Sequence, residues 1–481
     1  MCEKINPYWI KVIDPIESLM SPELGVLVKE ELSYPTEWYG EGQYHKIRNE
    51  GSKSTILGRS KKGHLYYTGL TSRILKFTKN KKIEVNILSE NMYSNISKNV
   101  KDVTLPESIK LPSDINLRKF QEEGIPKAQK RGRGVFIAPT GTGKTIFGLV
   151  LIKSLPVTKV LWLCHTKDLM WQTIKDAGKL FPNQIGVIGD KQDIRDKFIT
   201  VATRQSFKKL ADELGHLYDL VLVDEVHHIK KFYSSKKDDN GRYLLSEYPS
   251  ILKKVYAEYR YGLTATMEKD KQAVLAVESF IGPIIGEYTV EEGIKDGVMS
   301  KPRLVIEKLP LSYTIKNLRT YEEVYEFGIV KNLTRNRMII DAIKKYNDQG
   351  LSVLVFINHI IHGELLERMA RSQGLDTRLV NGETESSLRM EIKEQLTKKE
   401  ISSAISSTVW TEGVNIPTLN VVLNAADGKS MVRTLQLVGR GLRTSEGKTE
   451  LIIHDFFDPS HKFLISHFGE RISLYCDKGW L

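Results

Sequence analysis

Short runs of apolar and β-branched residues recur along the chain after residue 105, and longer stretches with helical spacing separate them. The runs are GVFIA (134–138), KVLWLC (159–164), LVLV (220–223), SVLVFI (352–357), VVLNA (421–425) and ELIIHD (450–455). Uninterrupted apolar strands between helices are typical of a mostly parallel sheet covered on both faces. The pattern therefore predicts an α/β fold, in which ligands bind in the loops after the carboxyl ends of the strands.

The chain before residue 106 has a different pattern and an uneven charge. Strand-like runs such as HLYYTGL and KIEVNIL lie between Gly, Asn and Lys turns. Residues 46–101 contain thirteen Lys and Arg against three acidic residues, a net charge of +10, whereas residues 1–45 have a net charge of −5. We predict a small β-containing domain here, whose cations would suit the phosphate backbone of a nucleic acid. A lysine-rich face that contacts only solvent would give the same composition.

The composition excludes several classes of protein. The 481 residues suggest two to four domains at roughly 100–200 residues per domain, and 41% hydrophobic residues exclude a wholly disordered chain. Three distant cysteines without a CxxC pair provide neither a disulfide framework nor a four-thiolate zinc site. No apolar run reaches the roughly 18–20 residues that cross a bilayer, and the N-terminus lacks the apolar core of a signal peptide. We expect a soluble, cytoplasmic protein without a membrane partner.

The first strand of the α/β part leads into a glycine-rich segment that predicts a phosphate-binding loop. The segment is Ala138-Pro139-Thr140-Gly141-Thr142-Gly143-Lys144-Thr145, and an apolar helix follows it. Glycines let the backbone N–H groups converge on phosphates at a helix N-terminus. Lys144 would reach the β- and γ-phosphates, and the Thr145 hydroxyl would bind Mg²⁺. The alternative is an ordinary glycine turn.

The LVLV run ends in Asp224-Glu225-Val226-His227-His228. A nucleotide hydrolase needs two carboxylates beside its phosphate loop: Asp224 to hold Mg²⁺ and Glu225 to orient and deprotonate the attacking water. Taken alone, an Asp-Glu pair after a strand is more often a solvated turn. The two histidines lack the spacing of a metal site, so we discount metal binding by them.

The order of motifs along the chain resembles that of the superfamily 2 helicases. The matching segments are Phe120-Gln121, APTGTGKT, HTKDLMWQ (165–172), VATRQS (201–206), DEVHH, TAT (264–266), FINH (356–359), VNGET (380–384), STVWTEGVNIP (407–417) and QLVGRGLR (436–443). DEVH is closer to the DExH groups than to the DEAD-box RNA helicases, which favours DNA. The likeness is greatest to the group of phage UvsW-like branch-migration helicases, and XPB-like translocases are more distant.

The resemblance implies two tandem RecA-like lobes that clamp ATP between them. Phe120 and Gln121 would bind adenine, and Gly413 would lie at the nucleotide. Gln436, Arg440 and Arg443 would approach the phosphates from the second lobe, where guanidinium groups neutralise the charge that develops during hydrolysis.

The resemblance also assigns residues to polynucleotide binding and to coupling. Coupling of the ATP site to the polynucleotide would involve His227, Thr264 and Thr266. The groove that tracks the strand would be lined by Thr166, Gln205, His359, Gly382 and Thr408.

One further segment predicts a β-hairpin that could separate strands at a DNA junction. Asn240-Gly241 lies between the strand-prone runs FYSSKK and RYLL, and Asn-Gly is a strong hairpin signal. Lys236, Lys237 and Arg242 would make the hairpin basic. An ordinary surface loop is the alternative.

We therefore expect an N-terminal accessory domain (1–105), a first RecA-like lobe (106–300) and a second lobe (301–481). The expected function is an ATP- and Mg²⁺-dependent DNA motor that remodels branched or forked DNA. We expect the protein to be a monomer. Its gene could belong to a phage that infects a bacterial host. The alternatives are an RNA helicase or restriction-enzyme motor subunit, and a DNA-binding architectural protein that uses ATP only as a switch.

Overall fold

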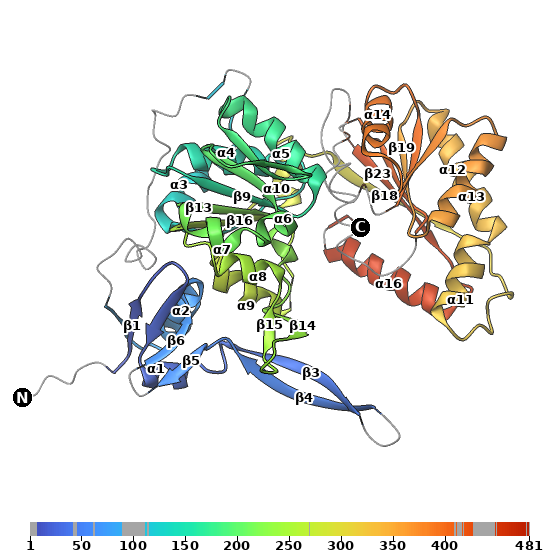
Figure 1. The fold of residues 1–481 in the computed structure, drawn as a ribbon. Helices are drawn as coiled ribbons and strands as arrows, with labels where there is room; N and C mark the ends of the chain where they lie inside the picture. Colours follow the sequence, from blue (N-terminus) through green and yellow to red (C-terminus); the bar gives the residue numbers. More distant parts are fainter. Residues whose placement is uncertain are drawn as a thin grey trace, which may run out of the picture. The chain divides into compact units, whose positions relative to one another are not determined.

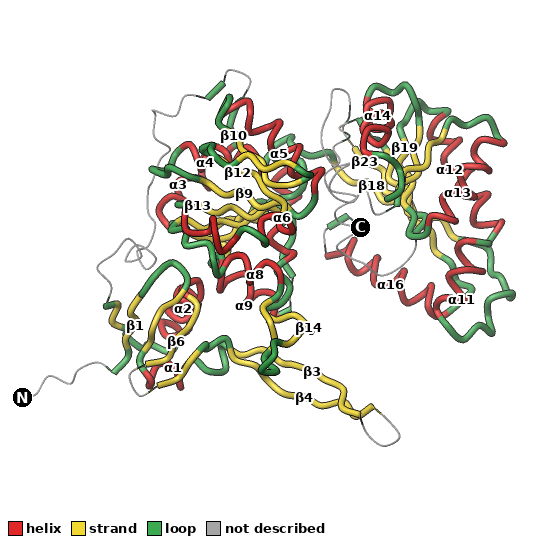
Figure 2. The backbone as a smooth tube through the Cα atoms, viewed as in Figure 1, coloured by secondary structure: helices red, strands yellow, loops and turns green. Residues whose placement is uncertain are grey.

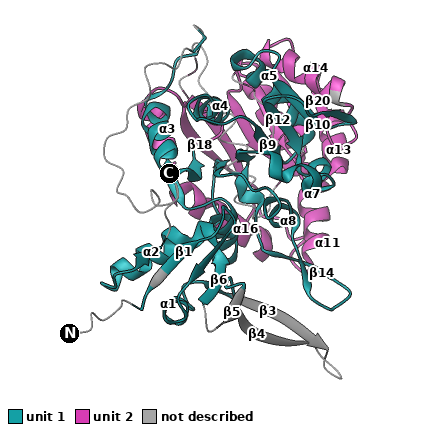
Figure 3. Cartoon of the chain, turned by 60° about the vertical axis from the view of Figure 1, so that its left-hand side comes forward, with its two compact units in different colours: residues 1–138, 143–288 teal, residues 139–142, 289–481 magenta. Residues whose placement is uncertain are grey.

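The computed structural model describes residues 7–41, 46–60, 63–88, 111–112, 115–268, 270–407, 410, 416, 418–426, 448, 450–477 and 479–480. The chain divides into two compact units (Figure 3). The first comprises residues 1–138 and 143–288, and the second comprises residues 139–142 and 289–481.

The first unit begins with a small five-stranded sheet of order β5-β6-β2-β1-β7 (Figure 1). Its strands are β1 (Trp9–Val12), β2 (Glu17–Met20), β5 (Gly58–Ser60), β6 (Gly63–Tyr67) and β7 (Asn86–Ile87), with helices α1 (Pro22–Leu27) and α2 (Thr71–Asn80) and the 3₁₀ turn η1 (Thr68–Leu70). The sheet joins strands from the acidic and the basic segments. The change of charge near residue 45 is therefore not a domain boundary.

Two antiparallel hairpins extend from the first unit, and Figure 2 shows both in yellow. The longer pairs β3 (Ser33–Glu41) with β4 (Lys46–Ser54), and the shorter pairs β14 (Tyr233–Lys237) with β15 (Tyr243–Leu245). The shorter one is the hairpin that the Asn-Gly signal predicts. Gly241 at its turn has φ +73°, a left-handed conformation that glycine adopts without strain.

The rest of the first unit is an eight-stranded sheet of order β11-β10-β12-β9-β13-β16-β8-β17, parallel except for the edge strand β11. The strands are β8 (Arg133–Ile137), β9 (Val160–Cys164), β10 (Ile185–Gly189), β11 (Gln192–Ile194), β12 (Ile199–Thr203), β13 (Leu220–Asp224), β16 (Tyr259–Thr264) and β17 (Ile284–Glu287). The helices are α3 (Lys119–Arg131), α4 (Lys144–Lys153), α5 (Lys167–Leu180), α6 (Arg204–Lys208), α7 (Ala211–Leu214), α8 (Glu247–Leu252) and α9 (Lys271–Phe280), with 3₁₀ turns η3 (Gly215–Leu217) and η4 (Val226–His228).

Alternate residues of the central strands face two separate cores, as expected for a sheet covered on both sides. Val160, Trp162 and Leu220 pack with α3, α4 and α5, whereas Leu161 and Val221 pack with α6 to α9. The second of these cores also contains residues of the small N-terminal sheet, so the two sheets of the first unit share one apolar core.

The second unit has a six-stranded parallel sheet of order β18-β23-β22-β19-β21-β20. Its strands are β18 (Lys301–Lys308), β19 (Val353–Phe356), β20 (Thr377–Val380), β21 (Ser403–Ser406), β22 (Val421–Asn424) and β23 (Glu450–Phe457). Its helices are α10 (Val290–Lys295), α11 (Tyr321–Tyr325), the π-helix η5 (Glu326–Val330), α12 (Leu333–Asn347), α13 (Ile360–Ser372), α14 (Ser386–Thr397) and α16 (Lys462–Asp477). Residues 290–299 pack into its core through Val290, Ile294 and Met299.

These sheets confirm the predicted fold class: two RecA-like α/β lobes with a small β-containing domain at the N-terminus. Among the described residues, no helix is long and apolar enough to span a membrane.

Candidate ATP site and its connections

The predicted phosphate loop joins the end of β8 to the start of α4. Gly141 and Gly143 have φ angles of +91° and +96°, which residues with a Cβ rarely adopt. Pro139 O accepts hydrogen bonds from Thr142 N (3.3 Å) and Thr142 Oγ1 (2.7 Å). Lys144 is 8% exposed, and its Nζ donates to Ala138 O at 3.0 Å. The loop thus curls at the N-terminus of a ten-residue helix, where peptide N–H groups favour an anion.

Gln121 is tied to this loop. Its Nε2 donates to Gly143 O at 2.9 Å, and its Oε1 accepts from Arg118 N at 2.8 Å. An amide has a second N–H and a second lone pair, so these bonds do not exhaust its capacity to contact adenine. Phe120 is 8% exposed and stacks on Tyr288, with ring centroids 4.2 Å apart. Phe120 therefore anchors the helix that carries Gln121, and adenine binding by either residue stays a prediction.

The two predicted catalytic carboxylates end the central strand β13. Asp224 is 6% exposed and accepts from Glu225 N at 3.0 Å. Burial, followed by the charge of Glu225, raises the pKa of Asp224 to about 7, and the Lys144 ammonium acts in the opposite direction. Glu225 has φ +51°, unusual for a residue with a Cβ, and this turns the chain sharply into η4. The oxygens of Asp224 and Thr145 are the type of ligand that Mg²⁺ prefers.

The residues predicted to couple the ATP site to a polynucleotide lie in one chain of contacts. His227 Nδ1 lies 3.3 Å from Glu225 Oε2 and 2.8 Å from Thr264 Oγ1. Thr264 Oγ1 also donates to Thr266 O at 2.7 Å. β13 and β16 are adjacent parallel strands, so their carboxyl ends bring these motifs together.

A second group of contacts, which the sequence motifs did not indicate, extends from the same turn. The rings of His228 and His165 stack with centroids 3.5 Å apart and planes at 9°. Arg204 Nε donates to His165 Nδ1 at 3.1 Å, and Arg204 forms an ion pair with Glu247. Because Nδ1 accepts this bond, a neutral His165 carries its proton on Nε2.

These contacts connect three segments that the resemblance assigns separately. They join the turn after β13 to His165, which precedes the α5 cap Thr166, and to Arg204, which precedes Gln205 in α6. The sequence signal for His165, Arg204 and His228 was that each follows the end of a strand of the same sheet. Among the described residues, no group of three or more His, Cys, Asp and Glu is arranged to hold a metal ion by itself.

In residues 289–481 the structure describes two of the predicted site residues. His359 precedes α13 after β19, and its ring lies 4.6 Å from that of Tyr325. Gly382 follows β20 in an open turn, where a Cβ at this residue would have no other atom within 4 Å. The other predicted residues of this unit lie outside the described residues: Thr408, Gly413, Gln436, Arg440 and Arg443.

Two family models match the chain. "Type III restriction enzyme, res subunit" matches residues 83–269, and "Helicase conserved C-terminal domain" matches residues 334–445. Each match covers motifs that sequence analysis assigned to one of the two lobes.

Relatives match across both lobes. The chain is 28% identical over 378 residues to "DNA 3'-5' translocase XPB2" of Sulfurisphaera tokodaii, covering 70% of this chain and 81% of that protein. It is 22% identical over 390 residues to "ATP-dependent DNA helicase uvsW" of Enterobacteria phage T4, covering 75% of each. The matches span only 54–65% of three other relatives.

A solved structure has a similar fold. The fragment of a putative HsdR subunit of a type I restriction enzyme from Vibrio vulnificus YJ016 aligns with a TM-score of 0.54 at 21% identity, over 70% of this chain and 64% of that one. Together with the two family models and the geometry of the phosphate loop, these similarities identify the enzyme class. The chain belongs to the superfamily 2 helicases and is an ATP-dependent helicase or translocase, an ATPase.

Proposed function

We propose that this motor acts on DNA and remodels branched or forked DNA, for example by branch migration, fork regression or unwinding of joint molecules. The observation that carries the motor assignment is the contact chain Glu225–His227–Thr264, which links the hydrolytic carboxylate to the strand-end loops. The choice of DNA is supported by the two relatives named above, one a DNA translocase and the other a DNA helicase. Identities of 28% and 22% favour neither the XPB-like nor the UvsW-like branch.

In this proposal ATP hydrolysis depends on four side chains of the first unit and on the N–H groups of the phosphate loop. Lys144 and the loop N–H groups bind the phosphates, and Glu225 orients and deprotonates the attacking water. Thr145 and Asp224 would hold Mg²⁺, which supplies positive charge to the phosphates. Gln436, Arg440 and Arg443 would complete the site from the second lobe, so that hydrolysis depends on lobe closure.

The proposed function predicts which polynucleotides stimulate hydrolysis. We expect multiple-turnover ATPase activity to rise most with forked and four-way DNA, less with linear duplex or single strands, and least with RNA. Strongest stimulation by RNA would instead support an RNA helicase. Turnover that no polynucleotide changes would support an ATP-driven conformational switch, whereas stimulation only by linear duplex would favour a restriction-type translocase.

The hairpin β14–β15 supports a role at the junction. Lys236, Lys237 and Arg242 are exposed, and Tyr243 is 45% exposed. Lys237 Nζ lies 4.9 Å from the Tyr243 ring centroid, and Lys53 Nζ of the longer hairpin lies 4.5 Å from it. Two cations around one exposed ring suit a surface that stacks on a base while it contacts phosphates.

Removing the tip of this hairpin should reduce the unwinding of DNA strands but leave ATP hydrolysis intact. We expect deletion of 234–243 to reduce unwinding of a four-way junction by about tenfold, an order-of-magnitude figure from the loss of about one base stack, while linear DNA still stimulates the ATPase. Tyr243→Ser with Leu244→Ser is the milder variant, because it keeps the turn. Junction unwinding that survives both changes would show that the hairpin is an ordinary surface loop.

A further inference from the structure

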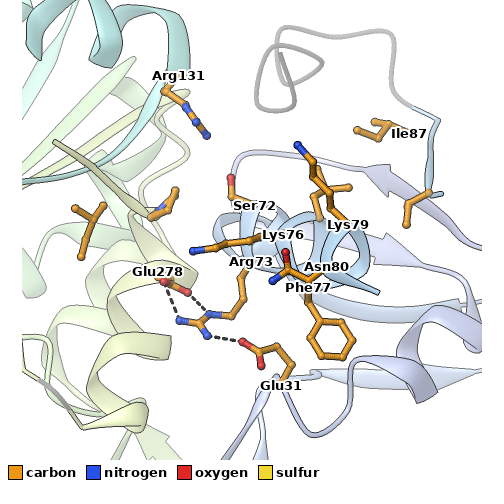
Figure 4. A pocket seen from close by; sticks show the side chains of 14 residues that line it. Glu31, Ser72, Arg73, Lys76, Phe77, Lys79, Asn80, Ile87, Arg131 and Glu278 are labelled. Carbon is orange, nitrogen blue, oxygen red and sulfur yellow. Dashed lines mark hydrogen bonds and ion pairs between the residues drawn. The ribbon is translucent and has the colours of Figure 1, made fainter. Parts of the chain in front are cut away.

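A cavity of about 860 Å³ lies in the first unit, between the small N-terminal sheet and the eight-stranded sheet. Helix α2 forms one wall, and the end of α3 with the segment before β17 forms the other. In Figure 4 Lys76 points from α2 toward the opposite wall, and Arg131 extends from the end of α3 into the same space. Lys79 also lines the cavity from α2.

The spacing on α2 explains why cations gather there. Arg73, Lys76 and Lys79 follow each other at intervals of three, so they lie along one face of the helix. Thr71, Ile74 and Thr78 on the other side are buried. This face accounts for part of the +10 charge of residues 46–101 and directs it at the cavity.

The two acidic side chains that line the cavity are already paired with Arg73. Arg73 Nε and Nη2 donate to Glu278 at 2.5 and 3.0 Å, and Nη1 donates to Glu31 at 2.5 Å. These bonds raise the pKa of Arg73 despite its burial. In contrast, Lys76, Lys79 and Arg131 have no ion pair with any of the residues that the structure describes. Their three charges therefore remain available to an anion.

The two walls are also fixed to each other. Arg73 joins α2 to α9 through Glu278, and Tyr67 packs on Phe280 with ring centroids 4.5 Å apart. Gly69 approaches so closely that a Cβ there would lie 1.9 Å from Glu278 O. The cations on the two walls thus keep their separation without a bound ligand, which reduces the entropy lost on binding.

We propose that this cavity binds the phosphate backbone of DNA, with Lys76 and Lys79 contacting it from the N-terminal domain and Arg131 from the first lobe. The Ser72 hydroxyl and the Asn80 amide, which also line the cavity, add neutral donors that suit phosphate oxygens. Contacts of this kind hold DNA without selecting a sequence. The inference rests on the proposed function only in taking DNA as the polyanion. It adds that the DNA-binding residues come from two domains of one compact unit.

The test uses the full chain with Lys76→Ala, Lys79→Ala and Arg131→Ala combined. Its binding to a fluorescent duplex is measured by anisotropy without nucleotide, over a series of KCl concentrations. Loss of three phosphate contacts should weaken binding by about tenfold or more and reduce the slope of log K against log salt by about 2 to 3. The matched control removes three exposed lysines elsewhere in the same unit: Lys153, Lys175 and Lys179.

Two results would overturn the proposal: an unchanged slope, or an equal loss of binding in the control variant. A variant with Lys76→Arg, Lys79→Arg and Arg131→Lys should restore binding, which separates a lost charge from a folding defect. Because this assay contains no ATP, its outcome is independent of whether branched DNA stimulates hydrolysis, which tests the proposed function.

Discussion

Glu225→Gln should reduce ATP hydrolysis by at least about 100-fold, because the variant loses the carboxylate that deprotonates water and general-base catalysis contributes about 10²–10⁴-fold. ATP binding should persist. The Glu225 charge raises the pKa of Asp224, so its removal leaves Asp224 more readily ionised and still able to hold Mg²⁺. Phosphate release in multiple turnovers, together with binding of a fluorescent ATP analogue, measures both effects.

Lys144→Ala should abolish hydrolysis by another route, the loss of the cation at the β- and γ-phosphates, and should weaken ATP binding as well. Lys153→Ala, at the exposed end of the same helix, is the control and should leave both quantities unchanged. Normal turnover in either active-site variant would contradict the assignment of the ATP site.

Arg471→Leu should cost the second unit about 3–5 kcal/mol of stability, because it leaves a buried carboxylate without its cation. Asp455 is fully buried, and Arg471 donates to it from α16 through Nε at 2.8 Å and Nη2 at 3.2 Å. Tyr475 and Asn424 add bonds of 2.9 and 3.2 Å, which neutralise no charge. Hydrogen exchange of residues 450–477 in increasing urea measures the loss, with peptides of the first unit as the internal reference.

The control for this experiment is an ion pair between β23 and the neighbouring strand β18. Arg303 contacts Glu450 at 3.0 Å, but both side chains are about half exposed, at 51% and 47%. Exposed pairs contribute about 0–1 kcal/mol, so Arg303→Leu should have little effect. An Arg471→Leu variant no less stable than Arg303→Leu would show that the buried pair is not needed to hold α16 on the sheet.

The sequence predicted the strands of both lobes well, because buried parallel strands are almost continuously apolar. Each of the six runs identified from the pattern became a strand within one or two residues of its predicted bounds. The N-terminal segment was harder. Of the run KIEVNIL, only two residues form a strand, β7. In the run HLYYTGL the strand ends at Tyr67, and a 3₁₀ turn follows. Short strands contain too few residues to show the alternation of apolar and polar positions by which a strand is recognised in sequence.

The same distinction applies to the site. The phosphate loop and the Asp224-Glu225 pair are contiguous segments, and their chemistry depends on local backbone geometry that the residues themselves impose. The stacking of His165 on His228 and the bond from Gln121 to Gly143 join residues that are distant in sequence. The stacking depends on the order of the strands, in which β9 lies beside β13 although β10 and β12 come between them in sequence. The bond from Gln121 depends on the packing of α3 against α4.

The sequence by itself thus determined the fold class and the superfamily resemblance, and it predicted the residues of the ATP chemistry, because each is encoded in contiguous motifs or in local periodicity. The tertiary structure decided what those motifs contact. It showed that acidic and basic N-terminal segments fold into one sheet and that this sheet shares a core with the first lobe. It also brought Lys76, Lys79 and Arg131 to one cavity. The net charge of a segment gives the strength of its attraction to a polyanion, but only packing determines where the charges meet.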